Sequence, residues 1–197
     1  MGRAEDMKKK NSSALREWGE SIAIALILAI VIRTFIIQAF KIPTGSMRPT
    51  LMEGDRILVS KYRYGPKIPF THHRLPGFTK PQRGDVIVFI YPEDPTKDFI
   101  KRLIAVGGET VEIGEGRIYV NGKALEGALF QKVYYYNRGI HGRVGHKIKV
   151  PQNHCFVLGD NSASSRDSRY WGFVSQDMVI GRAELIYWPP NRIRMVK

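Results

Sequence analysis

Residues 83–108 read RGDVIVFIYPEDPTKDFIKRLIAVGG, and this stretch contains two short runs of residues that favour β-strands. The runs at 85–91 and 99–106 are rich in Val, Ile, Phe and Tyr, and the Arg-Gly-Asp at 83–85 is typical of a turn. Neither run is part of a long helical period. The stretch therefore predicts two strands, with a turn before the first.

The same pattern continues along the chain after Phe40. Turn signals separate the runs, and Asn121-Gly122 is a strong hairpin signal. The further predicted strands are 56–60, 110–113, 117–120, 147–150, 155–158 and 179–188. Short strands at regular spacing predict a mainly β body over residues 41–197.

A different pattern precedes this body. Residues 22–32 are apolar on all sides, and Arg33 near the end of the run can reach the lipid headgroups. A cleaved signal peptide would need a small-x-small site after the run, and a soluble helix would have a polar face; both are missing. We therefore expect one transmembrane signal anchor at 19–40, preceded by a short cytoplasmic segment at 1–18.

The distribution of charge predicts the orientation and argues against nucleic acid. Lys8–Lys10 precede the anchor, which predicts a cytoplasmic N-terminus and an exported body. Of the formal charge of +13, +11 is spread over residues 41–197 (25 Lys and Arg against 14 Asp and Glu), without a helix-turn-helix, zinc or RNA-binding pattern. A basic body beside anionic lipid headgroups fits this distribution better than a nucleic-acid partner does.

Metal and disulfide chemistry are not expected. The single cysteine, Cys155, lies in an apolar run and is expected in the core. His72 and His73 have no partner at the spacing of metal ligands and are expected at the surface. We therefore expect neither a metal nor another cofactor.

Two segments could supply a nucleophile and a base. Pro43 and Gly45 favour a turn that presents the hydroxyl of Ser46, although serine is common in turns for structural reasons alone. A lysine can act as the base if burial lowers its pKa. Lys101 shares a strand face with apolar neighbours, but so does Arg102 on the other face, and alternation alone does not choose between them.

A third segment, 159–172, is a loop rich in hydroxyl groups between an apolar run and Trp171. It is either a solvated loop with an Asp167–Arg169 ion pair or a hydrogen-bonding shell around a buried amine.

Together these segments resemble the bacterial type I signal peptidase family, whose motifs occur here in the family's order. The matching segments are 42–51, Gly54-Asp55, 83–85, 91–95, 100–102, 159–172 and 181–183. Three positions depart from the family's pattern. Thr44 replaces a serine but keeps a hydroxyl, Ser162 replaces an arginine, and Gly107-Gly108-Glu109 stands where Pro-Gly-Asp is typical. Residues 110–154 are expected to form a reduced version of the family's inserted subdomain.

The resemblance implies roles for individual residues. Ser46 would be the nucleophile, Lys101 the general base, and the Ser46 N–H with the Thr44 hydroxyl the oxyanion hole. Ser165 would orient the lysine amine. The other implied assignments are a salt-bridge network of Arg102, Asp167 and Arg169, a loop anchor at Asp160, a cover over the lysine from Phe89, Phe99 and Leu158, and shallow substrate pockets lined by Phe40, Ile42, Met47, Leu51, Phe99 and Ile100.

The resemblance implies a signal-peptidase-like β-fold and a serine endopeptidase on the outer face of the cytoplasmic membrane. It would act as a monomer and remove signal peptides from exported preproteins after small-x-small motifs. Two alternatives belong to other classes. A self-cleaving DNA-binding repressor could use a similar dyad, but an apolar anchor stands where its DNA-binding domain would be. An inactive anchored β-module could bind exported proteins.

Overall fold

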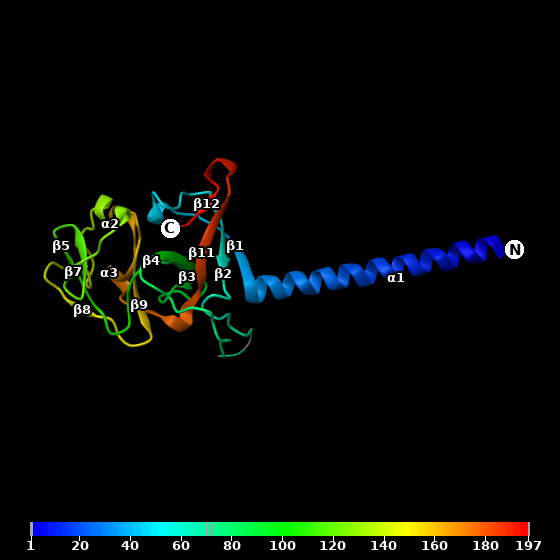
Figure 1. Ribbon diagram of the computed structural model, residues 1–197, viewed down its shortest axis with the longest axis horizontal. Helices are drawn as coiled ribbons and strands as arrows, with labels where there is room; N and C mark the ends of the chain where they lie inside the picture. Colours follow the sequence, from blue (N-terminus) through cyan, green and yellow to red (C-terminus); the bar gives the residue numbers. More distant parts are fainter. Residues whose placement is uncertain (1, 70, 72, 197) are drawn as a thin grey trace.

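The computed structural model describes residues 2–69, 71 and 73–196, and it consists of a long N-terminal helix and a β body. Helix α1 spans Gly2–Val31 and continues into a π-helical turn at Ile32–Ile36. Figure 1 shows the helix projecting away from the body. The stretch Arg16–Ile36 is 21 residues long and apolar enough to cross a membrane by length and composition.

The helical stretch ends four residues before the predicted end of the anchor. Residues 37–40, which we expected inside the anchor, belong to strand β1 (Ile37–Lys41). This strand pairs antiparallel with β2 (Arg56–Ser60), and Ile37 lies opposite Ser60. Our expectation that residues 37–40 belong to the anchor is therefore wrong. Their backbone groups pair with strand β2 and do not continue the helix.

The larger sheet has eight antiparallel strands. Seven of them follow the order β1-β2-β11-β3-β4-β9-β10, and β12 pairs with β11. The bounds of the remaining strands are β3 Val86–Ile90, β4 Asp98–Val106, β9 His154–Leu158, β10 Val174–Ser175, β11 Val179–Trp188 and β12 Arg194–Met195. Strand β11, from near the end of the chain, thus lies between β2 and β3.

A second sheet of four strands is formed by residues 110–149. Its order is β7-β6-β5-β8, and it lies at the end of the body opposite helix α1 (Figure 1). The bounds are β5 Thr110–Gly114, β6 Arg117–Val120, β7 Lys123–Ala124 and β8 Ile148–Lys149, with the short helix α2 at Ala128–Lys132. The turn from β6 to β7 uses positive φ angles at Asn121 and Gly122, as the hairpin signal predicts. Its core is continuous with the larger sheet through Ile104 and Phe156.

The predicted strands are confirmed, and the 56–60, 117–120 and 179–188 strands have the predicted bounds. Among the described residues of the segment 64–83, one isolated bridge joins Lys67 and Arg74. Cys155 is buried and free, as expected. His73 is exposed, whereas His72 lies outside the described residues.

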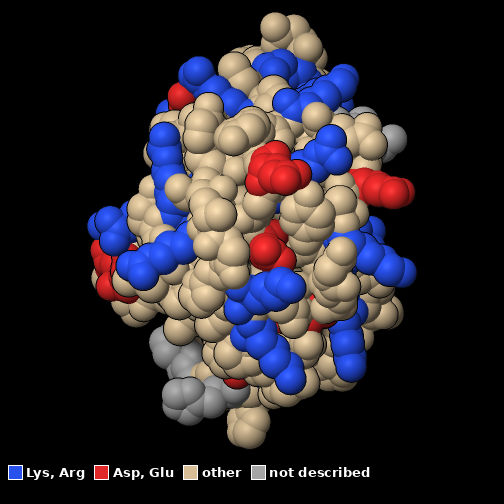
Figure 2. All heavy atoms as spheres, turned by 90° about the vertical axis from the view of Figure 1, so that its left-hand side faces the viewer, with Lys and Arg blue, Asp and Glu red and all other residues tan. Residues whose placement is uncertain are grey.

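Charged side chains are mixed on the face of the body furthest from the anchor. Figure 2 shows this face, where Lys and Arg side chains are spread out with Asp and Glu between them. A single dense basic patch, which a nucleic-acid backbone would favour, is not visible on this face.

Candidate active site

Ser46 lies on a single turn of 3-10 helix, Gly45–Met47, shortly after β1. Two hydrogen bonds attach this turn to the segment after β9. The Asn161 N–H donates to the Ser46 carbonyl at 3.0 Å, and the Asn161 side-chain amide donates to the Gly45 carbonyl at 3.0 Å. Met47, which follows the serine, is fully buried. Asn161 therefore fixes the backbone of this turn against the 159–172 loop.

Lys101 in strand β4 reaches this serine. Its Nζ lies 2.6 Å from Ser46 Oγ, and the two side chains come from positions 55 residues apart. Lys101 is 4% exposed and Ser46 is 9% exposed. The neighbouring Arg102 is also buried, but its guanidinium is bound elsewhere. The structure therefore brings together the serine and the lysine that the sequence predicted as a pair.

Burial lowers the pKa of Lys101 to about 8. The removal of water from the charged amine is the main cause, and Arg169 lowers the pKa further. The carboxylates of Asp167 and Asp160 act in the opposite direction and raise it. The Phe99 ring contributes to the apolar surroundings, with its centroid 5.5 Å from the amine. A lysine with this pKa is substantially neutral near pH 8 and can accept a proton.

Arg102 forms a buried ion pair with Asp160. The guanidinium donates from Nε at 2.8 Å and from Nη2 at 2.7 Å, so that the pair is bidentate. It also donates to the Gly84 carbonyl at 2.6 Å. The Thr50 hydroxyl donates to the same Asp160 carboxylate at 2.5 Å. This pair joins strand β4 to the start of the 159–172 loop and to the segment that follows Ser46.

A second buried pair organises the rest of the loop. Arg169 binds the Asp167 carboxylate from Nε and Nη2, both at 2.8 Å, and both side chains are fully buried. Arg169 also donates to the Ser162 hydroxyl at 2.8 Å. We expected Arg102, Asp167 and Arg169 to form one network; in the structure Arg102 pairs with Asp160, and Arg169 pairs with Asp167. Both of these ion pairs are buried, whereas Ala163, Ser164, Arg166 and Tyr170 of the same loop are exposed.

Ser165 lies in the predicted region without the predicted contact. Its side chain is buried, and its Oγ makes no hydrogen bond in the described structure. A Cβ built on Gly159 would lie 2.2 Å from Ser165 Oγ and 2.5 Å from the Ser46 carbonyl oxygen, so both atoms contact the same glycine. The assignment of Ser165 to orient the amine stays a prediction.

The predicted oxyanion donors are both available. Thr44 is exposed, and neither its hydroxyl nor the Ser46 N–H has a hydrogen-bond partner among the described residues. Five of the six predicted pocket residues share one apolar cluster, namely Phe40, Ile42, Met47, Leu51 and Ile100. The sixth, Phe99, packs in another cluster with Phe89, one of the predicted lysine covers. Leu158, the remaining predicted cover, is buried with Ile104 and Phe156.

Some contacts of the site were not predicted. Tyr91 stacks on Phe99 with a centroid distance of 4.1 Å, and Trp171 packs edge-on against Phe99 at 5.7 Å. Asn161 binds the Gly45–Met47 turn that carries Ser46, which we call the nucleophile turn, and Thr50 binds Asp160. Both residues lie inside the matching segments, which was the available signal. The partners of Asn161 and Thr50 lie 116 and 110 residues away, so only the folded structure identifies them.

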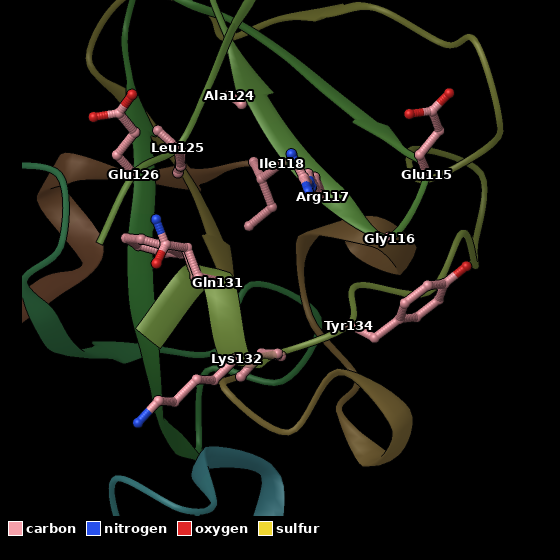
Figure 3. A pocket seen from close by; sticks show the side chains of 12 residues that line it. Glu115, Gly116, Arg117, Ile118, Ala124, Leu125, Glu126, Gln131, Lys132 and Tyr134 are labelled. Carbon is pink, nitrogen blue, oxygen red and sulfur yellow. The ribbon is translucent and has the colours of Figure 1, made fainter. Parts of the chain in front are cut away.

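A cavity of about 600 Å³ lies away from Ser46 and Lys101, between β6 of the second sheet and helix α2. Figure 3 shows Glu115, Arg117 and Glu126 around it, with Ile118 and Leu125 among its apolar lining. Neither Ser46 nor Lys101 lines it. Across residues 2–69, 71 and 73–196, no group of three His, Cys, Asp or Glu side chains is placed to hold a metal ion.

Comparisons with known proteins identify the family. The family model described as signal peptidase, peptidase S26, matches residues 15–188. A probable signal peptidase I-2 of Synechocystis sp. is 38% identical over 98% of this chain and 83% of its own length. Signal peptidase I T of Bacillus subtilis is 31% identical over 98% of this chain and 95% of its own length.

A crystal structure of a signal peptidase I from Enterococcus faecalis matches 53% of this chain and 97% of its own chain. The two sequences are 35% identical, and the TM-score is 0.44. The family match includes the nucleophile turn, strand β4 and the 159–172 loop, which meet around the Ser46–Lys101 contact. The chain therefore belongs to the signal peptidase family, peptidase S26.

Proposed function

We propose that this chain is a membrane-anchored serine endopeptidase that removes N-terminal signal peptides from exported preproteins. Ser46 is the nucleophile and Lys101 the general base. The contact of 2.6 Å between the buried Lys101 amine and Ser46 Oγ carries the proposal. Membership of the signal peptidase family supports the same substrate class.

The reaction follows from this pair of groups. Neutral Lys101 accepts the hydroxyl proton of Ser46 as Oγ attacks the scissile carbonyl carbon. The Ser46 N–H and the Thr44 hydroxyl stabilise the oxyanion of the tetrahedral intermediate. The protonated Lys101 then gives its proton to the leaving amine, and the acyl-enzyme remains. A water molecule, deprotonated by Lys101, hydrolyses the ester and restores Ser46.

The apolar cluster beside Ser46 suits small substrate side chains. Ile42, Met47 and Leu51 are almost fully buried there, which leaves little room for a large side chain. We therefore propose that cleavage follows a small-x-small motif, with Ala or Gly just before the cut. Well-packed apolar walls discriminate by size because an added side chain forces them to move.

The anchor supports a single-pass topology. At 1.5 Å per residue, the 21-residue stretch Arg16–Ile36 is about 32 Å long, close to the thickness of the bilayer core. With Lys8–Lys10 on the cytoplasmic side, the body lies on the outer face of the cytoplasmic membrane. We expect it to act there as a monomer.

The test is cleavage of a preprotein by the purified full chain in neutral detergent. Wild type should release the mature protein, and Ser46→Ala should not, because it removes the nucleophile. Ser164→Ala, at an exposed serine, is the matched control and should cleave like wild type. A wild-type chain that binds the preprotein without cleaving it would favour the inactive β-module instead.

A further inference from the structure

A small cavity lies where the anchor meets the body, away from the catalytic pair. Its volume is about 210 Å³. Thr34 and Gln38 line it from the end of the helix and from β1, and Lys61 and Lys67 line it from the segment after β2. Val179 and Ile180, at the start of β11, supply apolar walls. Figure 1 shows this junction, where helix α1 joins β1 beside β2.

Two lysines line this cavity, and the nearby carboxylates of Asp98 and Asp177 act on them only from beyond ion-pair distance. The Lys61 amine donates to the Arg33 carbonyl at 3.1 Å, which brings it to the end of the helical segment. Among the described residues, no carboxylate forms an ion pair with Lys61, Lys67 or Arg33. An anion in this cavity would therefore meet two amines that no carboxylate holds in a direct ion pair among the described residues.

The pKa values of the two lysines agree with this geometry. Burial lowers the pKa of Lys61, and the neighbouring Arg33 lowers it further, while Asp98 opposes them. Burial also lowers the pKa of Lys67, with Arg74 acting in the same direction and Asp177 against it. A bound anion would offset both effects and favour the charged amines.

The position of the cavity along the anchor indicates where its ligand comes from. This step rests on the proposed function, in which the apolar stretch that ends at Ile36 spans the bilayer. Thr34 and Gln38 then lie at the outer boundary of the hydrocarbon core, at the depth of the lipid headgroups. The nearest abundant anion at that depth is the phosphate of a phospholipid.

We propose that this cavity binds the headgroup of an anionic phospholipid from the outward-facing leaflet. Lys61 and Lys67 attract the phosphate, and Thr34 and Gln38 offer hydrogen bonds to the headgroup. The apolar walls at the start of β11 contact the lipid carbons. A lipid bound between helix and body fixes how the β body sits on the membrane surface.

The experiment measures lipid binding to the purified full chain by native mass spectrometry in neutral detergent. Phosphatidylglycerol is titrated first, with phosphatidylcholine and inorganic phosphate as separate arms. The test variant is Lys61→Gln/Lys67→Gln. Its charge-matched control is Lys123→Gln/Lys149→Gln, at two exposed lysines of the second sheet. Lys61→Arg/Lys67→Arg keeps the charge and should keep the lipid.

We expect the test variant to lose tenfold or more in phosphatidylglycerol affinity, while wild type, the control and the arginine variant stay alike. Equal affinity in all four proteins would overturn the proposal, and so would equal binding of phosphatidylcholine. Inorganic phosphate that binds as tightly as the lipid, with the same lysine dependence, would show a free-anion site and overturn the lipid assignment.

Cleavage in the same detergent separates this proposal from the proposed function. All four proteins should cleave alike there, because the two lysines lie outside the catalytic pair. A wild type that fails to cleave but binds phosphatidylglycerol through these lysines refutes the peptidase and supports the lipid site. Normal cleavage with lipid binding that ignores the lysines removes the lipid site alone.

Discussion

The lowered pKa of Lys101 predicts how the peptidase activity depends on pH. The structure lowers the pKa of the amine from 10.5 to about 8. Because only the neutral amine can accept the Ser46 proton, activity should rise with pH along a limb centred near 8. At pH 8 about half of the amines would be neutral, against roughly 0.3% for an unshifted lysine with a pKa of ~10.4 to 10.5.

The shape of this limb follows from the same value. From a pKa of about 8, kcat/KM should rise about ninefold between pH 6 and 7, about fivefold to sixfold between pH 7 and 8, and less than twofold between pH 8 and 9. The assay is the initial rate on a fluorogenic signal-peptide substrate well below KM. A limb centred near 10.5, or a flat profile from pH 6 to 9, would refute the lysine as the base.

Substitution of the base completes the test. Lys101→Arg keeps the positive charge, but arginine does not release its proton at working pH. The loss of general-base catalysis should lower kcat/KM by about 10²-fold to 10⁴-fold. Lys97→Arg, at an exposed lysine in the turn before the same strand, should keep wild-type activity. Both variants must first be shown to fold by circular dichroism. Substantial activity in Lys101→Arg would leave Ser46 without its base.

Four further predictions concern the substrate, the loop, the core and the membrane. Changing the residue before the cut from Ala to Leu should slow cleavage at least tenfold, since overpacking costs about 1–3 kcal/mol; equal rates on the two substrates would refute small pockets. Ser165→Ala should lower kcat about tenfold or more and leave the melting temperature nearly unchanged; an unchanged kcat would remove its orienting role. Arg102→Ala should destabilise the fold by about 3–5 kcal/mol, because Asp160 would be left as a buried unpaired charge; thermal unfolding beside the exposed-site control Arg143→Ala measures this, and equal melting temperatures would contradict it. Protease added outside spheroplasts should digest the chain beyond Phe40 and spare the N-terminus, and the opposite protection pattern would reverse the topology.

Local patterns were sufficient to predict most strands. The 56–60 and 117–120 strands are bounded by Gly-containing turns, so the residues themselves specify where each strand stops. Strand β1 was missed because residues 35–40 continue the apolar character of the helix. Only the pairing of β1 with β2 distinguishes the two, and pairing depends on residues about 20 positions away.

The candidate site was predicted by its order of motifs and not by local pattern. Strand alternation could not choose between Lys101 and Arg102, and in the structure both are buried. Lys101 and Arg102 differ in the distant segment that contacts each side chain. The Ser46 turn meets the lysine, whereas Asp160 meets the arginine. These contacts join residues 55 and 58 positions apart, so no periodicity within one strand could reveal them.

The place of strand β11 in the larger sheet sets the time at which the enzyme can become active. The nucleophile turn adjoins β1 and β2, the base lies on β4, and β11 is inserted between β2 and β3. Because β11 spans Val179–Trp188, the strand that joins the two halves of the sheet is made long after Ser46 and Lys101. We therefore expect the Ser46–Lys101 pair to form only after β11 has been synthesised and has paired with both β2 and β3.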